Sequence, residues 1–258
     1  MNQLMKVVIG LTLFTSALSY PLQVFAAEVD EEAVTILKRS TAFMAKATEF
    51  KITTEFGFDV VQETGQKLEF GAHHEVTIRR PDKAHLEFSR RDGVQGRMVF
   101  DGKQIVVLDP DEKVYSLEEI KGDVDTAFDF LVEELQMPIP LDDFFSSDPA
   151  KSLAANLESG YVVGESEVAG ISCDHLALRN ARVDFQIWIA RGDKPLPRRI
   201  VITYKNEEGQ PQFWANFLEW DLAPHVPDTL FSTKPPEGAT QIPFVIIDPS
   251  LNDGRGTR

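Results

Sequence analysis

The chain has 258 residues, of which 43% are hydrophobic and 10% aromatic, and its 41 acidic and 26 basic side chains give a formal net charge of -15. This apolar content is typical of a folded protein and excludes an intrinsically disordered chain. The negative charge repels the phosphates of nucleic acids, so nucleic-acid binding is not expected. The only cysteine, Cys173, has no partner for an intramolecular disulfide, so stability must come from an apolar core.

Residues 1–26 have the pattern of an export signal. Lys6 provides the basic start, residues 7–18 form an apolar stretch, and Val24-Phe25-Ala26 fits the small-residue rule for cleavage. The apolar stretch is too short, and too interrupted by serine and threonine, for a membrane span. We therefore expect cleavage near Ala26 and a mature protein of residues 27–258 that is soluble outside the cytoplasm.

The first part of the mature chain predicts one helix followed by strands. Apolar residues recur with helical spacing from Ala33 to Ala47, directly after three acidic residues that suit a helix N-terminus. Alternation of apolar and polar residues then predicts five strands, at residues 50–60, 68–79, 84–88, 98–100 and 105–108. Their connections are too short for crossover helices, which favours an antiparallel meander.

The middle of the chain returns to helical spacing. Apolar residues from Val124 to Leu135 form one stripe, and Met137-Pro138 ends it. A second helix is predicted from about residue 148 to residue 157, so the helical insert covers about residues 123–157. We expect this insert to lie between two blocks of strands.

Five further strands are predicted after the insert, at residues 161–168, 171–178, 183–189, 200–205 and 213–220. In the last of these, strict alternation places Trp214 and Trp220 on one face and Phe213 and Phe217 on the other, so we expect both faces to be covered. Residues 252–258 are expected to be disordered.

Together these elements predict an α+β fold in a single domain. About nine or ten antiparallel strands with one N-terminal helix and one helical insert are most simply arranged as a strongly curved sheet, an incomplete β-barrel, closed on its concave side by a helical lid. No long linker of low hydrophobicity divides the two strand blocks.

Several short segments carry a resemblance to a known family. They are Phe100-Asp101-Gly102-Lys103, Cys173-Asp174-His175-Leu176-Ala177, Phe185-Gln186-Ile187-Trp188-Ile189, the run from Pro195 to Lys205, and Pro235-Pro236-Glu237-Gly238-Ala239. With the export signal and the helical insert, they resemble an uncharacterised family of predicted periplasmic proteins over most of the mature chain. That family is similar to the lipoprotein localisation factors LolA and LolB.

The resemblance implies a periplasmic location and a LolA/LolB-like incomplete barrel with helices as a lid over an apolar cavity. In the localisation factors this cavity takes lipid acyl chains. No catalytic residues and no cofactor come with the resemblance, and a shared fold does not by itself transfer a function.

The residues offer little for catalysis or for a metal. Cys173 and His175 share one strand face and are candidates for a thiolate-imidazolium pair, but the sequence shows no oxyanion hole. His73 and His74 are adjacent in a strand and point to opposite faces, so both cannot bind one ion without a bulge. We therefore expect no enzyme, no metal and no cofactor.

A large set of apolar residues fits two interpretations of the fold, a packed core or a ligand cavity. The candidates for cavity lining are Phe56, Phe58, Phe70, Ile78, Phe88, Met98, Phe100, Phe128, Leu131, Leu135, Phe144 and Phe145. The first hypothesis is a carrier that holds a lipid, a lipoprotein acyl chain or another apolar ligand. The alternatives are a protein-binding structural or envelope-sensing module and an enzyme that depends on Cys173 and His175.

Overall fold

A computed structural model describes residues 29–134 and 157–244. The helical elements are α1 (Glu31–Ala45), α2 (Val124–Asp129), the π-helix η1 (Phe130–Glu134) that continues α2, and the short 3-10 helix η2 (Asp228–Phe231). The strands are β1 (Glu49–Val61), β2 (Lys67–Arg79), β3 (Lys83–Arg90), β4 (Gln95–Phe100), β5 (Gln104–Asp109), β6 (Val114–Glu119), β7 (Ser159–Val168), β8 (Ile171–Arg179), β9 (Val183–Ala190), β10 (Pro197–Tyr204), β11 (Gln212–Asp221) and β12 (Thr240–Gln241).

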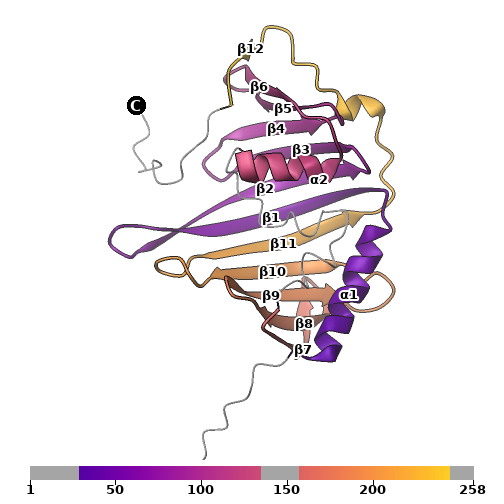
Figure 1. The fold of residues 1–258 in the computed structure, drawn as a ribbon, viewed down its shortest axis with the longest axis vertical. Helices are drawn as coiled ribbons and strands as arrows, with labels where there is room; N and C mark the ends of the chain where they lie inside the picture. The colour runs from indigo at the N-terminus through magenta and orange to yellow at the C-terminus, as the bar shows by residue number, and fades with distance from the viewer. Residues whose placement is uncertain (1–28, 135–156, 245–258) are drawn as a thin grey trace, which may run out of the picture.

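All twelve strands belong to one sheet, in the order β12-β6-β5-β4-β3-β2-β1-β11-β10-β9-β8-β7. The strands from β1 to β6 form one meander and those from β7 to β11 form a second. The two meanders meet where β1 pairs with β11. Strands from the two halves of the chain thus lie side by side at the centre of the sheet (Figure 1).

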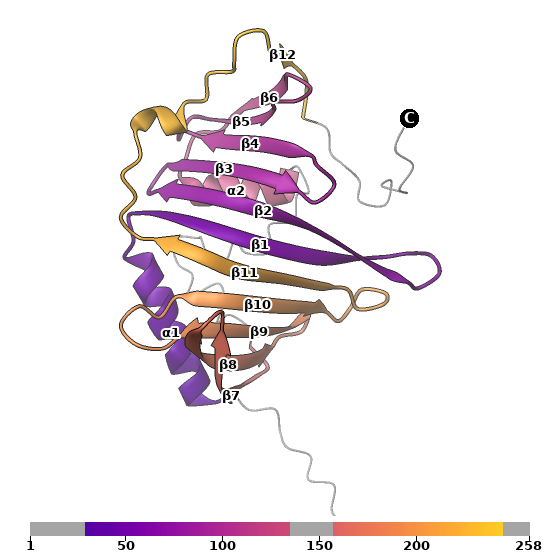
Figure 2. The same cartoon turned by 180° about the vertical axis from the view of Figure 1, so that it is seen from behind.

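Both α-helices lie on the same face of this sheet, α1 across the strands of the second meander and α2 across β2 and β3 (Figures 1 and 2). Each begins at an aspartate whose side chain accepts a hydrogen bond from a backbone N–H, Asp30 from Glu32 and Asp123 from Thr126, both at 2.9 Å. Such caps satisfy donors that the first turn leaves open. We call this side of the sheet the covered face and the opposite side the uncovered face.

The core fills the space between the covered face and the two helices. Ile52 from β1, Ile78 from β2, Leu37 from α1 and Leu131 from η1 are at most 1% exposed and belong to one apolar cluster. Burying such side chains supplies the main driving force for folding. Within the described ranges, no helix is long and apolar enough to cross a bilayer.

The ten strands and the N-terminal helix predicted from alternation are confirmed, with bounds that differ by a few residues. Two strands were not predicted, and the expected number is therefore wrong. β12 pairs parallel to β6, so the sheet is mixed and not wholly antiparallel. The described chain is mostly β. Several predicted features lie outside the described residues. They are the signal peptide, Leu135, the rest of the insert up to residue 156 and the tail of residues 252–258.

The prediction for the two tryptophans of β11 is wrong. The pairing of β1 with β11 shifts between Thr53 and Thr54, and Leu218 is the extra residue. Because one extra residue reverses the alternation, Trp220 lies on the covered face with Phe217, at a ring distance of 5.7 Å. Trp214 stays on the uncovered face, opposite Gly57.

Because of this bulge, we expect substitutions at Trp220 and at Leu218, only two residues apart, to lower the free energy of unfolding by different amounts. Trp220→Ala removes a ring that packs on Phe50 and Phe217, and we expect a loss of about 3 kcal/mol in the free energy of unfolding. Leu218→Ala changes a side chain that is 52% exposed, and we expect a change within about 0.5 kcal/mol. Urea unfolding of both variants measures the difference, and equal costs would contradict the assigned faces.

Candidate functional site

The predicted cavity residues occupy three different environments. Ile78, Phe100 and Leu131 are fully buried, and Met98 and Phe128 are 6% and 8% exposed, so these five belong to the packed core. Leu135, Phe144 and Phe145 lie outside the described residues. The remaining four, Phe56, Phe58, Phe70 and Phe88, lie on the β1–β3 part of the covered face and are only partly buried or exposed.

An apolar rim forms where the β1–β2 hairpin extends beyond its neighbours (Figure 1). Phe58 and Phe70 are each 40% exposed and stack at 6.1 Å between ring centroids, and Leu68 beside them is 39% exposed. Leu68 and Phe70 lie beyond Ala72, where β3 stops pairing with β2, so this end of β2 has no neighbour on that side. Phe58 lies at the last position of β1 that pairs with β11. We call these three residues the hairpin rim.

The hairpin rim continues without a polar break into the covered face. Phe56 follows Phe58 on the same face of β1, is partly buried, and packs against the core. Its ring lies 5.6 Å from that of Phe213 in the core. A group of exposed apolar residues that adjoins a core in this way is a candidate interaction surface.

A histidine lies further along β2 on this face. The ring of His74 meets that of Phe56 edge-on at 4.5 Å and that of Phe88 at 6.2 Å. Burial lowers the pKa of His74 to about 4, and the charge of His73 adds to the lowering. His74 is therefore neutral at pH 7 and is a polar group set among phenylalanines. His73 is exposed on the opposite face.

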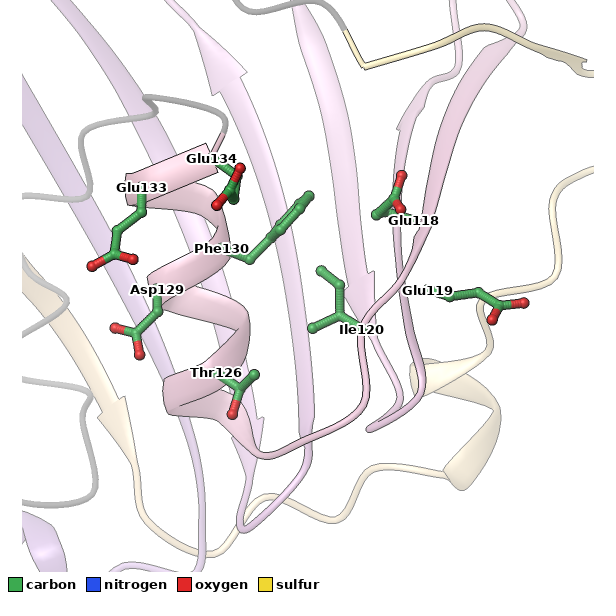
Figure 3. A pocket seen from close by; sticks show the side chains of 8 residues that line it. All are labelled: Glu118, Glu119, Ile120, Thr126, Asp129, Phe130, Glu133 and Glu134. Carbon is green, nitrogen blue, oxygen red and sulfur yellow. The ribbon is translucent and has the colours of Figure 1, made fainter.

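A pocket with a volume of about 370 Å³ lies elsewhere, between β6 and the helix formed by α2 and η1 (Figure 3). Its lining residues are Glu118, Glu119, Ile120, Thr126, Asp129, Phe130, Glu133 and Glu134. Five of the eight are carboxylates, and none is a residue predicted from the sequence to line a cavity. A pocket with this charge is unsuited to an anionic or purely apolar ligand.

The uncovered face carries a row of aromatic and arginine side chains that the sequence did not lead us to predict as a unit. The row consists of His175, Trp188, Arg199, Trp214 and Arg91, and we call it the Trp-Arg row. The ring of His175 stacks on Trp188 at 4.1 Å, and the guanidinium of Arg199 lies 5.7 Å from the Trp188 ring and 5.6 Å from the Trp214 ring. The guanidinium of Arg91 lies 5.7 Å from the Trp214 ring.

Acidic partners and two glycines hold this row in place. The indole N–H of Trp214 donates to Glu69 at 3.1 Å, and Arg91 donates to Glu69 at 2.7 Å and to Glu55 at 3.1 Å. A Cβ on Gly57 would lie 2.8 Å from the Trp214 ring, so only glycine leaves room for the indole there. Gly57 is directly opposite Gly71 on β2, where a Cβ would lie 3.0 Å from the guanidinium carbon of Arg91. This pair of glycines is the signal in the sequence that could have pointed to the row.

A second pocket of about 300 Å³ adjoins the row. It is lined by Glu55, Ala72, His73, Ser89, Arg90, Arg91 and Leu218. Leu218, the extra residue of the β11 bulge, is among the most exposed large apolar side chains of the described chain.

The structure does not assemble the predicted pair of Cys173 and His175. The Cys173 side chain is fully buried, its Sγ donates to the backbone oxygen of Ile171 at 3.3 Å, and burial raises the pKa of the thiol. His175 Nε2 instead lies 3.0 Å from Gln186 Oε1. A buried thiol with a raised pKa is a poor nucleophile. Within the described ranges, no three His, Cys, Asp or Glu side chains gather in a way that could hold a metal ion.

Comparisons with known proteins agree with the family resemblance. Residues 33–245 match the model of the family described as "Predicted periplasmic protein (DUF2092)". No curated protein matches the chain.

Solved structures similar to this chain include an uncharacterized conserved protein from Thermus thermophilus, with 12% identity, 83% of this chain and 99% of that chain covered, and a TM-score of 0.48. LprF from Mycobacterium bovis has 12% identity, coverage of 78% and 98%, and a TM-score of 0.48. A LolA superfamily protein from Nitrosomonas europaea has 10% identity, coverage of 78% and 97%, and a TM-score of 0.39.

The buried histidine predicts a pH dependence of stability. His74 stays neutral in the folded protein down to a pKa of about 4, whereas in the unfolded chain it takes up a proton below its ordinary value of 6.5. Its contribution is therefore complete above pH 6.5 and is lost as the pH falls toward 4. Between pH 7 and pH 5, we expect the wild type to lose about 2 kcal/mol more in the free energy of unfolding than His74→Gln.

His73→Gln is the matched control, because His73 is the adjacent histidine on the exposed side of the same strand. Burial is the larger cause of the lowered pKa of His74 and the charge of His73 the smaller, so His73→Gln should keep most of the wild-type loss across this pH range. The prediction is wrong if the free energy of unfolding falls by the same amount for the wild type and for His74→Gln between pH 7 and pH 5. That result would mean that folding does not lower the pKa of His74.

Proposed function

We propose that this chain, which belongs to the family of predicted periplasmic proteins named DUF2092, is a binding or carrier protein for an apolar, lipid-like ligand. In this proposal, residues 1–26 direct export and the ligand lies on the covered face, between a curved sheet and its helices. The observation that carries the proposal is the hairpin rim, where phenylalanines 40% exposed to solvent adjoin the buried apolar face.

Two properties of the rim favour a ligand over simple surface exposure. Phe58 and Phe70 are directly paired across the hairpin and stack, so they form one continuous surface and not scattered exposed residues. An acyl chain laid on such a surface gains roughly 0.8 kcal/mol for each methylene it buries, which supports binding without any charged anchor. The rim also has free access to solvent, as a site of loading and release requires.

The first test removes the rim and leaves the core intact. In the double variant Phe58→Ser/Phe70→Ser, we expect the protein to remain folded, since both rings are partly exposed. We expect its affinity for an apolar ligand to fall by tenfold or more, because the two rings no longer provide apolar area for the ligand to bury. Ligand is measured by organic extraction of natively purified protein followed by mass spectrometry.

Leu218→Ser is the matched control, since Leu218 is an exposed apolar residue on a different part of the sheet. It should retain the ligand of the wild type. A wild-type protein that contains no lipid, or a rim variant that keeps its lipid, would contradict the carrier proposal.

A second candidate function, a protein-binding module, is favoured by the Trp-Arg row. Tryptophan and arginine are the residues most enriched at the energetic centres of protein interfaces. Here they lie on the uncovered face, held rigid by Glu69 and Glu55, beside a pocket that includes an exposed leucine. Rigid anchors lose little side-chain entropy when a partner binds.

This second candidate predicts a face-specific contact in cells. A photo-crosslinker at Thr203, which lies on the uncovered face of β10 four residues from Arg199, should capture one defined partner in the periplasm. Arg199→Ala should remove that product. The amount of extracted lipid should not change in Arg199→Ala, because the row lies on the other face. A crosslinked product that survives Arg199→Ala would exclude the row as the contact.

A further inference from the structure

The polar groups of the covered face narrow the class of ligand, on the assumption that the carrier function proposed above is correct. Along β2, the covered face runs from the hairpin rim at Phe70, through Ala72, to His74 and then to the buried Ile78. Phe70 and His74 are four residues apart, which is about 13 Å along a strand. A ligand chain that runs from the rim to His74 passes over Ala72, which is 5% exposed, and so must displace the side chains that cover it.

The residues directly beside His74 on the covered face carry no charge. The positions opposite it are Thr54 on β1 and Phe88 on β3. Thr54 is 3% exposed and belongs to the small set of buried polar side chains in the described residues. Of the next neighbours on this face, Phe56, Ala72, Val76 and Leu86 are uncharged, whereas Arg90, opposite Ala72, is exposed and forms an ion pair with Asp92.

We propose that His74, with Thr54 beside it, binds an uncharged hydrogen-bonding group of the ligand, such as an ester, amide or hydroxyl, while the ligand's hydrocarbon chain lies along Phe56 and the hairpin rim. The His74 ring meets Phe56 edge-on and is flanked by Phe88, so its orientation is fixed before a ligand arrives. A neutral imidazole both donates and accepts one hydrogen bond, which matches an ester or an alcohol.

The same surroundings disfavour a charged head group at this position. A carboxylate or phosphate placed beside His74 would lose its hydration without gaining an unpaired cation, because the nearby Arg90 is already paired with Asp92. Burying such a charge is far more costly than burying an ester. The ligand class is therefore a neutral amphiphile, or a lipid whose ester region and not its head group reaches His74.

Three probes with the same hydrocarbon chain test this inference: monodecanoylglycerol, decanoate and decane. We expect the wild-type protein at pH 7.5 to bind monodecanoylglycerol about tenfold more tightly than decane, the effect of one good buried hydrogen bond, and more tightly than decanoate. His74→Leu should bind the glycerol ester and decane with similar affinity. His74→Gln, which keeps a donor and an acceptor, should retain most of the preference.

The results separate this inference from the carrier proposal on which it rests. If the wild type binds none of the three probes, both are wrong. If it binds decane and the ester equally, or if His74→Leu keeps the preference for the ester, the carrier proposal stands and the role of His74 is wrong. Tighter binding of decanoate than of the ester would overturn the assignment to an uncharged group. Circular dichroism of each variant confirms folding before binding is measured.

Discussion

The pairing of β1 with β2 on one side and β11 on the other sets the side-chain phase of the whole sheet. Each strand alternates between two faces, and hydrogen-bonded neighbours must agree in phase. β1 therefore imposes one pattern on both meanders, and Ile52 near its start is fully buried. A change of phase in β1 would turn the apolar side chains of both halves of the chain toward solvent. The register also shifts at three places, between Val162 and Gly164 in β7, between Pro197 and Arg199 in β10 and at Leu218 in β11. The bulge at Leu218 moves Trp220 into the core.

This phase divides the protein into two faces with different physical character. The covered face is apolar and carries α1 and α2 (Figure 1), and its side chains at the hairpin rim are exposed to solvent. The uncovered face is polar and aromatic, and its Trp-Arg row has its donors paired with Glu69, Glu55 and Asn216. An apolar ligand and a protein partner would thus use opposite sides of one sheet, and neither would compete with the other.

Local patterns in the sequence predict the strands that alternate clearly but not those that depend on distant partners. β12 has two residues and exists because it pairs with β6, a contact that no local pattern reveals. β6 itself buries Ser116 at 8% exposure, which blurs the alternation of apolar and polar residues. The bulge at Leu218 was also not predictable, because it arises from pairing with β1.

The same limit applies to the candidate site. Alternation correctly places Phe58, Phe70 and Ile78 on one face, yet Ile78 is buried and the two phenylalanines are exposed. The difference comes from β3, which covers one part of β2 and ends before the other. The exposure of a side chain depends on which strands lie beside its own strand. It therefore cannot be predicted from the sequence of one strand alone.

A crystal structure of the natively purified protein, without lipid removal, tests the central claim most directly. The account predicts continuous, elongated electron density on the covered face that starts at Phe58 and Phe70 and ends at His74. A covered face that is closed by its own side chains from Phe70 to His74, with no such density, would contradict it.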